Sequence, residues 1–262
     1  MRSVVIRGSI AFDKRPGVYI QQVIDSIRSW HTGELILSTW NNQQHAAQGL
    51  IGVDKVVCSD DPGEGPVQQF LRQAQSYYVG VSVSTGSEVM VTRTDILHFR
   101  DLFELRNTYP KKTKANISAF DEKLLIGNMM TIRPGSDIDI STYRANDWFQ
   151  VGTREDILKW GRVFEDISKL DINRITELRN NGSICTENLW FKMLLKRYVN
   201  PELDITEWPD DLAMHALIDN FEVMNTITTA RAINLNWAFQ PQRLGCYITE
   251  EQYLHEYNAL CE

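Results

Sequence analysis

The chain has 262 residues, of which 43% are hydrophobic and 23% are charged, and its formal net charge at pH 7 is −7. This composition is ordinary for a globular protein with a substantial core. The acidic balance argues against nucleic acid as the main partner, because phosphate backbones are bound by clustered Lys and Arg. A nucleoside diphosphate stays possible if a metal ion neutralises its phosphates locally.

The four cysteines are widely spaced, at positions 58, 185, 246 and 261, and form no CxxC pair. They predict neither a zinc site nor a disulfide framework, so we expect reduced thiols in a cytoplasmic protein. The N-terminus runs into a short apolar strand without a signal-peptide pattern. No apolar run approaches the ~18–20 residues that span a bilayer, so we expect membrane contact to be peripheral.

The first hundred residues alternate short apolar strands with amphipathic helices. Strands are expected at residues 4–6, 34–39, 54–58 and 88–91, and helices at residues 20–30 and 67–78. This rhythm predicts a parallel sheet with crossover helices. In such sheets the ligand crevice lies outside the carboxyl ends of the strands. Four residues of interest follow strands there: Gly8, Trp40, Asp61 and Asp95.

Beyond residue 96 the pattern is less regular. A strand is expected at residues 124–132, and Thr153 and Thr186 are expected to cap two helices. Pro209 is expected to begin a further helix, and the segment from Thr249 to Gln252 has the spacing of a capping box. The sequence therefore predicts one α/β domain with a helical C-terminal third.

The strongest candidates for chemistry follow the fourth predicted strand. Asp95 could hold a hard divalent cation through its oxygens, or it could be a turn residue. Arg93 lies two positions earlier and would point to the same side in an extended segment. It could contact a phosphate, pair with a carboxylate, or lie at the surface.

Other candidates lie on helices and near aromatic residues. Arg72 and Gln73 could reach a nucleotide from the second predicted helix, or they could be solvated surface residues. Asp147 precedes two aromatic residues, which could pack on sugar rings or simply belong to the core. Glu187 could be a general base for an acceptor hydroxyl, in competition with Asp147, or a first-turn acid favoured by the helix dipole.

His98 follows Asp95 by three residues and could approach a metal, or it could be structural. The sequence has none of the motifs HExxH, GxxxxGK[ST], GxGxxG or GxSxG. Interpretations as a metalloprotease, a P-loop NTPase, a dehydrogenase or an α/β-hydrolase therefore have no motif support.

Taken in chain order, several short segments resemble the WavE-type lipopolysaccharide synthesis family, glycosyltransferases with a GT-A-like fold. The matching segments are residues 4–8, 35–40, 60–63, 72–73, 92–95, 146–149 with Gly152, and 186–190. Each segment is short, and the resemblance lies in their order between residues 3 and 200.

The resemblance implies a GT-A-like αβα sandwich, which we expect to form one domain over residues 1–262 together with the helical C-terminal third that the residue pattern predicts. Residues 1–100 would bind the nucleotide sugar, residues 101–200 would form the acceptor side, and residues 201–262 would be a helical extension. It also implies a nucleotide-sugar donor, with UDP-hexose expected, bound by Gly8, Trp40, Asp61, Arg72, Gln73, Arg93, Thr94 and Asp95.

The same resemblance implies Mn²⁺ or Mg²⁺ at Asp95, bridging the donor diphosphate. If the reaction inverts, Asp147 or Glu187 would deprotonate the acceptor. That acceptor would be a glycan or lipid-linked glycan of the bacterial surface (lipopolysaccharide, O-antigen or capsule), at the cytoplasmic face of the inner membrane.

Two alternatives stay open. A sugar nucleotidyltransferase usually carries a longer Gly-rich N-terminal loop with a lysine than Arg7-Gly8-Ser9 provides. A non-catalytic nucleotide-binding scaffold in a glycan-assembly complex is compatible with the single acid that follows Arg93.

Overall fold

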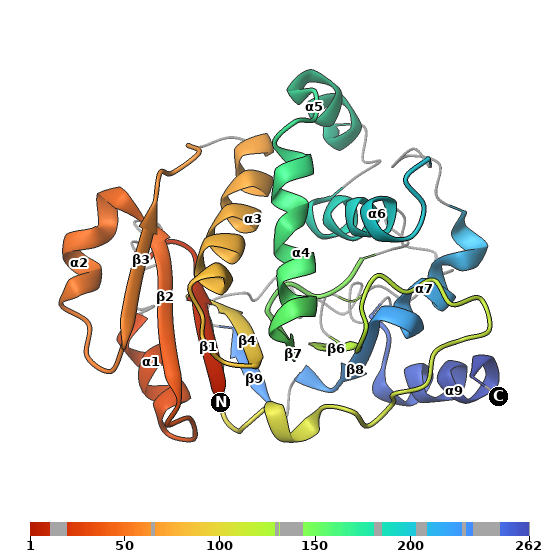
Figure 1. The fold of residues 1–262 in the computed structure, drawn as a ribbon, viewed down its shortest axis with the longest axis horizontal. Helices are drawn as coiled ribbons and strands as arrows, with labels where there is room; N and C mark the ends of the chain where they lie inside the picture. The colour runs from red at the N-terminus through yellow and green to blue at the C-terminus, as the bar shows by residue number, and fades with distance from the viewer. Residues whose placement is uncertain are drawn as a thin grey trace.

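A seven-stranded sheet lies at the centre of the fold, with strand order β3-β2-β1-β4-β7-β6-β8 (Figure 1). The computed structural model describes residues 1–10, 20–63, 66–128, 131, 144–180, 185–202, 209–226, 229–232 and 247–261. The first four strands pair in parallel and are β1 (Arg2–Arg7), β2 (Glu34–Trp40), β3 (Lys55–Ser59) and β4 (Glu88–Arg93). The predicted parallel sheet of the N-terminal half is confirmed.

The other side of the sheet is mixed. Strand β7 (Phe149–Thr153) runs antiparallel to β4 and to β6 (Leu124–Gly127), and β8 (Phe221–Met224) is parallel to β6. The strand expected at residues 124–132 thus ends at Gly127, and β7 and β8 were not predicted. A second, two-stranded sheet pairs β5 (Ile96–His98) with β9 (Ala230–Ala232) in antiparallel fashion.

Helices cover both faces of the central sheet. On one face, α1 (Ile20–Arg28) buries four aliphatic side chains in a core with Val4 and Ile6 of β1, and α2 (Gln44–Gln48) adds Ala47. Each fully buried aliphatic side chain contributes about 1.5–3 kcal/mol. On the other face, Val5 of β1 packs in a core with α3 (Pro66–Ser82), α4 (Arg154–Ile167) and α6 (Thr186–Tyr198). The predicted αβα sandwich is confirmed.

Aromatic side chains pack helices α3, α4 and α6 together on this second face. Helices α3 and α4 lie side by side, with α6 beside α4 (Figure 1). The rings of Trp160 and Trp190 stack with centroids 5.2 Å apart, and Tyr77 meets Trp190 edge-on at 5.3 Å. Trp190 Nε1 also donates a hydrogen bond of 2.8 Å to the Trp160 carbonyl. These contacts hold α6 against α3 and α4.

The predicted helix caps are confirmed at two places and wrong at one. Thr153 caps α4 by accepting from the Asp156 amide, and Thr249 forms a capping box with Gln252 at the start of α9 (Glu250–Leu260). At α6 the N-cap is Cys185, and Thr186 is already the first helical residue. The predicted cap was therefore one position too late, because a hydroxyl at the first helical position does not accept from the following turn as an N-cap does.

The C-terminal third is largely helical, but it also completes the sheet. The helix expected from Pro209 is divided into a 3-10 turn, η3 (Asp210–Leu212), and α7 (Ala213–Asn220), and Phe221 begins β8. Helix α5 (Ile172–Asn180) was not predicted, and two further 3-10 turns are η1 (Asn41–Gln43) and η2 (Phe103–Leu105). Within the described parts of the chain, no helix has both the length and the apolar character needed to cross a bilayer.

Candidate functional site

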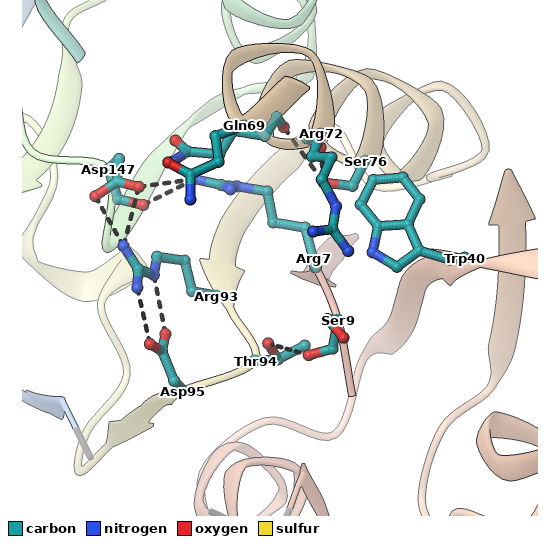
Figure 2. A pocket seen from close by; sticks show the side chains of 12 residues that line it. Arg7, Ser9, Trp40, Gln69, Arg72, Ser76, Arg93, Thr94, Asp95 and Asp147 are labelled. Atoms are coloured by element: carbon teal, nitrogen blue, oxygen red, sulfur yellow. Dashed lines mark hydrogen bonds and ion pairs between the residues drawn. The ribbon is translucent and has the colours of Figure 1, made fainter. Parts of the chain in front are cut away.

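A pocket opens at the carboxyl ends of β1, β2 and β4, beneath helix α3 (Figure 2). The topology puts the pocket there, because three parallel strands deliver their last residues to the same edge of the sheet. The described residues that line it are Arg7, Gly8, Ser9, Trp40, Gln69, Arg72, Gln73, Ser76, Arg93, Thr94, Asp95 and Asp147.

Two arginines and an aspartate form the centre of the pocket wall. Arg7 of β1 and Arg93 of β4 are register partners, so their like charges lie next to each other. The carboxylate of Asp147 relieves this repulsion by accepting from both: Arg7 Nη2 lies 3.4 Å and Arg93 Nη1 3.2 Å from its Oδ2. Arg7 Nη2 also donates to the Asp147 carbonyl at 3.0 Å.

A second carboxylate grips Arg93 from the other side. Asp95 Oδ1 accepts from Arg93 Nε at 2.9 Å, and Asp95 Oδ2 accepts from Arg93 Nη2 at 2.8 Å. Figure 2 shows the guanidinium of Arg93 held between Asp95 and Asp147. The side chains of both acids are 3% exposed, whereas that of Arg93 is 24% exposed. Arg93 is therefore the charged group that this cluster presents to solvent.

The ionisation of this cluster follows from its contacts. Burial disfavours the charge of Asp147, but Arg93 and Arg7 outweigh burial and hold the pKa of this carboxyl below its usual range. Burial likewise opposes the charge of Arg93, and the two carboxylates outweigh it and raise its pKa. For Arg7, burial prevails and lowers the pKa, with Asp147 opposing. Asp147 is consequently an ionised but weakly basic group.

The opposite wall of the pocket carries another arginine. Arg72 on α3 donates from Nη2 to Asp61 Oδ2 at 2.8 Å, and its guanidinium carbon lies 5.4 Å from the centroid of the Trp40 ring. Such a cation–π contact fixes the plane of the guanidinium. Asp61 is not among the described lining residues, so it positions Arg72 from behind.

Backbone groups form the floor of the pocket. Gly8 has φ +118°, a conformation that L side chains rarely adopt, and its amide donates to the Ser38 carbonyl at 3.0 Å. A Cβ at this position would lie 3.4 Å from Thr94 Oγ1. Thr94 is itself fixed, because its hydroxyl donates to the Ser9 carbonyl at 2.8 Å. The turn after β1 thus needs glycine where the chain enters the pocket.

Sequence comparison adds the family to this geometry. The family model for WavE lipopolysaccharide synthesis matches residues 2–231. The chain belongs to this family. No match was found among curated proteins. Membership in the WavE family connects the protein with lipopolysaccharide synthesis and confirms the resemblance drawn from the short segments.

Among solved structures, the WavE-family chain is similar to the glycosyltransferase GlyE of Streptococcus pneumoniae TIGR4, with a TM-score of 0.38 and 14% identity over 75% of this chain and 43% of that one. It thus spans less than half of that enzyme's length. It is also similar to HddC of Yersinia pseudotuberculosis, with a TM-score of 0.34 and 11% identity over 60% of this chain and 78% of that one. A putative glucose-1-phosphate thymidylyltransferase of Bacillus anthracis gives a TM-score of 0.43 and 9% identity over 93% and 94% of the two chains.

Glu187, the other candidate base in this WavE-family protein, lies near the pocket but is not among its described lining residues. It occupies the first turn of α6, and its Oε2 lies 3.8 Å from Arg144 Nη2. The charge of Glu187 also acts on Arg93, and that of Arg144 on Asp147. The structure therefore brings Glu187 to the edge of the charged cluster.

The remaining candidates are core residues. Trp148 and Phe149 are fully buried against the sheet, which selects the core alternative over contact with a sugar. His98 is also buried, its Nε2 lies 2.7 Å from Thr92 Oγ1, and burial lowers its pKa to about 3. A neutral histidine bonded to a threonine in this way is a structural residue.

Sequence reasoning missed several pocket residues: Arg7, Ser9, Gln69 and Ser76. Arg7 gave a usable signal, because a charged residue ends an otherwise apolar strand immediately before a glycine. The other three carry no signal, since Ser and Gln on a turn or a helix face are most often solvated.

The residues of the pocket do not fit a preformed cation site. Asp95 and Asp147 are the two carboxylates among the described lining residues, and both accept from arginines. The described part of the chain contains no group of three or more His, Cys, Asp or Glu that could hold a metal ion. A cation at Asp95 would compete with Arg93 for the carboxylate oxygens. The expected role of Mn²⁺ or Mg²⁺ therefore stays a prediction.

Proposed function

We propose that this protein transfers a sugar from a nucleoside diphosphate sugar, UDP-hexose being the expected donor, to a glycan or lipid-linked glycan acceptor in lipopolysaccharide or related surface-polysaccharide synthesis. The reaction would take place at the cytoplasmic face of the inner membrane. Family membership supports the pathway. The observation that carries the chemistry is the partly exposed Arg93 guanidinium, held by two buried carboxylates at the end of β4.

The donor diphosphate would bind in the pocket between Arg93 and Arg72. These guanidinium groups lie on β4 and α3, on opposite walls, and both are partly exposed. Planar guanidinium forks are suited to phosphate oxygens. When the bond to the sugar breaks, negative charge grows on the leaving diphosphate, and fixed cations stabilise it without reorganisation.

For the acceptor side we propose Glu187 as the general base if the reaction inverts the anomeric centre. Asp147 is less suited, because two arginines hold its pKa low and occupy its oxygens. Among the described residues, Glu187 forms an ion pair with Arg144 that is long, at 3.8 Å. NMR of the product anomer tests this assignment, since retention of configuration would remove the need for a base.

A thermal-shift panel of nucleoside diphosphates and nucleotide sugars tests the function. Ligand at about 100 times its Kd should stabilise the protein by about 2.7 kcal/mol. The Arg93→Gln variant should lose this stabilisation. Arg197→Gln is the matched control, because Arg197 also bonds two acids, Asp166 and Glu165, but does not line the pocket.

Turnover assays separate the alternatives. Release of a nucleoside diphosphate from one donor of the panel, with transfer to an acceptor glycan, supports the proposal. Release of pyrophosphate from a nucleoside triphosphate and a sugar phosphate would identify a nucleotidyltransferase instead. Binding of nucleotides without turnover of any donor would indicate the scaffold.

A further inference from the structure

We propose that the donor diphosphate is held by the guanidinium groups of Arg93 and Arg72 without a bridging divalent cation, and that Asp95 is a positioning residue for Arg93 rather than a metal ligand. This inference rests on the proposed function, because it specifies how the same pocket holds a nucleoside diphosphate.

The first support is the hydrogen-bonding capacity of Arg93. A guanidinium group carries five N–H donors. The bonds to Asp95 use Nε and Nη2, and Nη1 donates to both oxygens of Asp147, at 3.3 and 3.2 Å, which lie close enough together to share one of its hydrogens. Each terminal nitrogen carries two N–H groups, so one on Nη1 and one on Nη2 remain for a ligand. Because Arg93 lines the pocket, these donors can meet a phosphate there.

The second support is the environment of Asp95. Its two oxygens take part in a bidentate pair with Arg93, at 2.9 and 2.8 Å, and its side chain is 3% exposed. A cation at Asp95 would weaken two charge-assisted bonds by competing for the same oxygens. Arg93 would then lie next to the cation, and the two like charges would repel each other.

The third support is the way in which the cluster orients Arg93. The charges alternate in sign along the chain Arg7, Asp147, Arg93 and Asp95. Arg7 at its buried end packs over the rings of Tyr77 and Trp190, with its guanidinium carbon 5.7 and 5.9 Å from their centroids. Arg7 thus fixes Asp147, and Asp147 and Asp95 together fix Arg93. Arg93 is therefore oriented before a ligand arrives.

The fourth support is the repetition of this design on the opposite wall. Arg72 is 26% exposed at its side chain, is bonded to Asp61 and lies over Trp40. The pocket thus presents two partly exposed guanidinium groups, each bonded to a carboxylate. Two cations facing each other across a pocket supply the positive charge that a diphosphate requires.

Calorimetric titration with UDP tests the inference on the full-length protein. We expect the Kd in EDTA and the Kd in Mn²⁺ to agree within about twofold, a difference in binding free energy below RT ln 2. Binding that weakens more than about tenfold in EDTA would overturn the inference and leave the proposed function standing. Failure of UDP, GDP, CDP and dTDP to bind in either condition would overturn the proposed function and this inference with it.

Two substitutions separate the positioning role of Asp95 from metal ligation. Asp95→Asn should weaken UDP binding by the same factor in EDTA and in Mn²⁺, because in both conditions Arg93 loses one of its two carboxylate partners. A defect confined to Mn²⁺ would show a metal ligand and overturn the inference. Arg93→Lys keeps the charge but loses the fork, so we expect at least about tenfold weaker binding in both conditions.

Arg197→Gln serves as the control for these variants, with unchanged Kd expected. Circular dichroism melting checks that each variant is folded. If Asp95→Asn does not fold, the comparison of EDTA with Mn²⁺ on the unmodified protein still decides the question.

Discussion

Replacing Asp147 by Asn should destabilise the protein strongly, in addition to any effect on activity. The carboxylate of Asp147 is the shared counter-ion of Arg7 and Arg93, whose guanidinium groups are register partners on adjacent strands. Asn keeps the shape of the side chain but removes its charge. Arg93 would keep its bonds to Asp95, whereas Arg7, with its side chain 4% exposed, would lose the carboxylate that it bonds.

The size of the effect follows from the burial of this pair. Removing one partner of a buried ion pair costs about 3–5 kcal/mol, because the other charge stays buried without compensation. For a chain of this length, each kcal/mol shifts the melting temperature by about 2–4 °C. We therefore expect Asp147→Asn to melt about 6–12 °C below the unmodified protein, taking the lower end of the energy range.

Thermal and urea unfolding followed by circular dichroism measure this loss. Asp121→Asn is the matched control, because Asp121 also pairs with a cation, Lys159 at 2.7 Å, but is 80% exposed. An exposed pair of this kind contributes at most about 1 kcal/mol. Adding Arg7→Met to Asp147→Asn should restore part of the stability, since it removes the uncompensated charge. Unchanged stability of Asp147→Asn together with lost turnover would refute this reasoning and favour Asp147 as the catalytic base.

Three further substitutions test other parts of the structure. Burial lowers the pKa of His98 to about 3, whereas an unfolded histidine titrates near 6.5. The contribution of His98 to the free energy of unfolding is therefore fully present above about pH 6.5 and is lost as the pH falls. Between pH 7.5 and pH 5 this loss should amount to about 2 kcal/mol by urea unfolding, and His98→Gln should remove that pH dependence. Gly80→Ala should destabilise the protein by about 1–3 kcal/mol, because the alanine Cβ would lie 2.5 Å from Val5 Cγ1 and 2.8 Å from Ser38 Cβ. A melting temperature equal to that of the unmodified protein would contradict the packing of α3 on the sheet. Lys123→Met should raise the melting temperature, because the buried Nζ has no hydrogen-bond partner in the described structure. The opposing effect is a cation–π contact, with Nζ 4.7 Å from the centroid of the Tyr257 ring. A lower melting temperature would mean that this contact outweighs the cost of burying the charge.

The sequence predicted the parts of the fold that depend on local patterns. The first four strands and helices α1 and α3 carry clear apolar runs or helical periodicity, and their order implies the parallel sheet. That sheet in turn brings Gly8, Trp40 and Asp95 to one edge. Strand β7 was missed because it is short and Gln150 and Gly152 interrupt its apolar residues, which leaves neither a continuous apolar run nor a long alternation.

Pairings between distant residues could not be predicted in this way. Asp147 is separated from Arg7 by 140 positions, and neither residue type nor spacing shows that the two side chains meet. The same holds for Arg93, which sequence reasoning assigned to phosphate or to a carboxylate without deciding. The structure shows that Arg93 is bonded to the carboxylates of Asp95 and Asp147. Binding of a phosphate by Arg93 is the part that needs to be tested.

A crystal structure with bound UDP or UDP-hexose is the most direct test of the central claim that this pocket holds the diphosphate of a nucleotide sugar. We predict that phosphate oxygens lie within hydrogen-bond distance of Arg93, with the ligand between β4 and α3. A nucleotide bound elsewhere would contradict the claim. So would a diphosphate that points away from Arg93 while Arg93 keeps its bonds to Asp95 and Asp147.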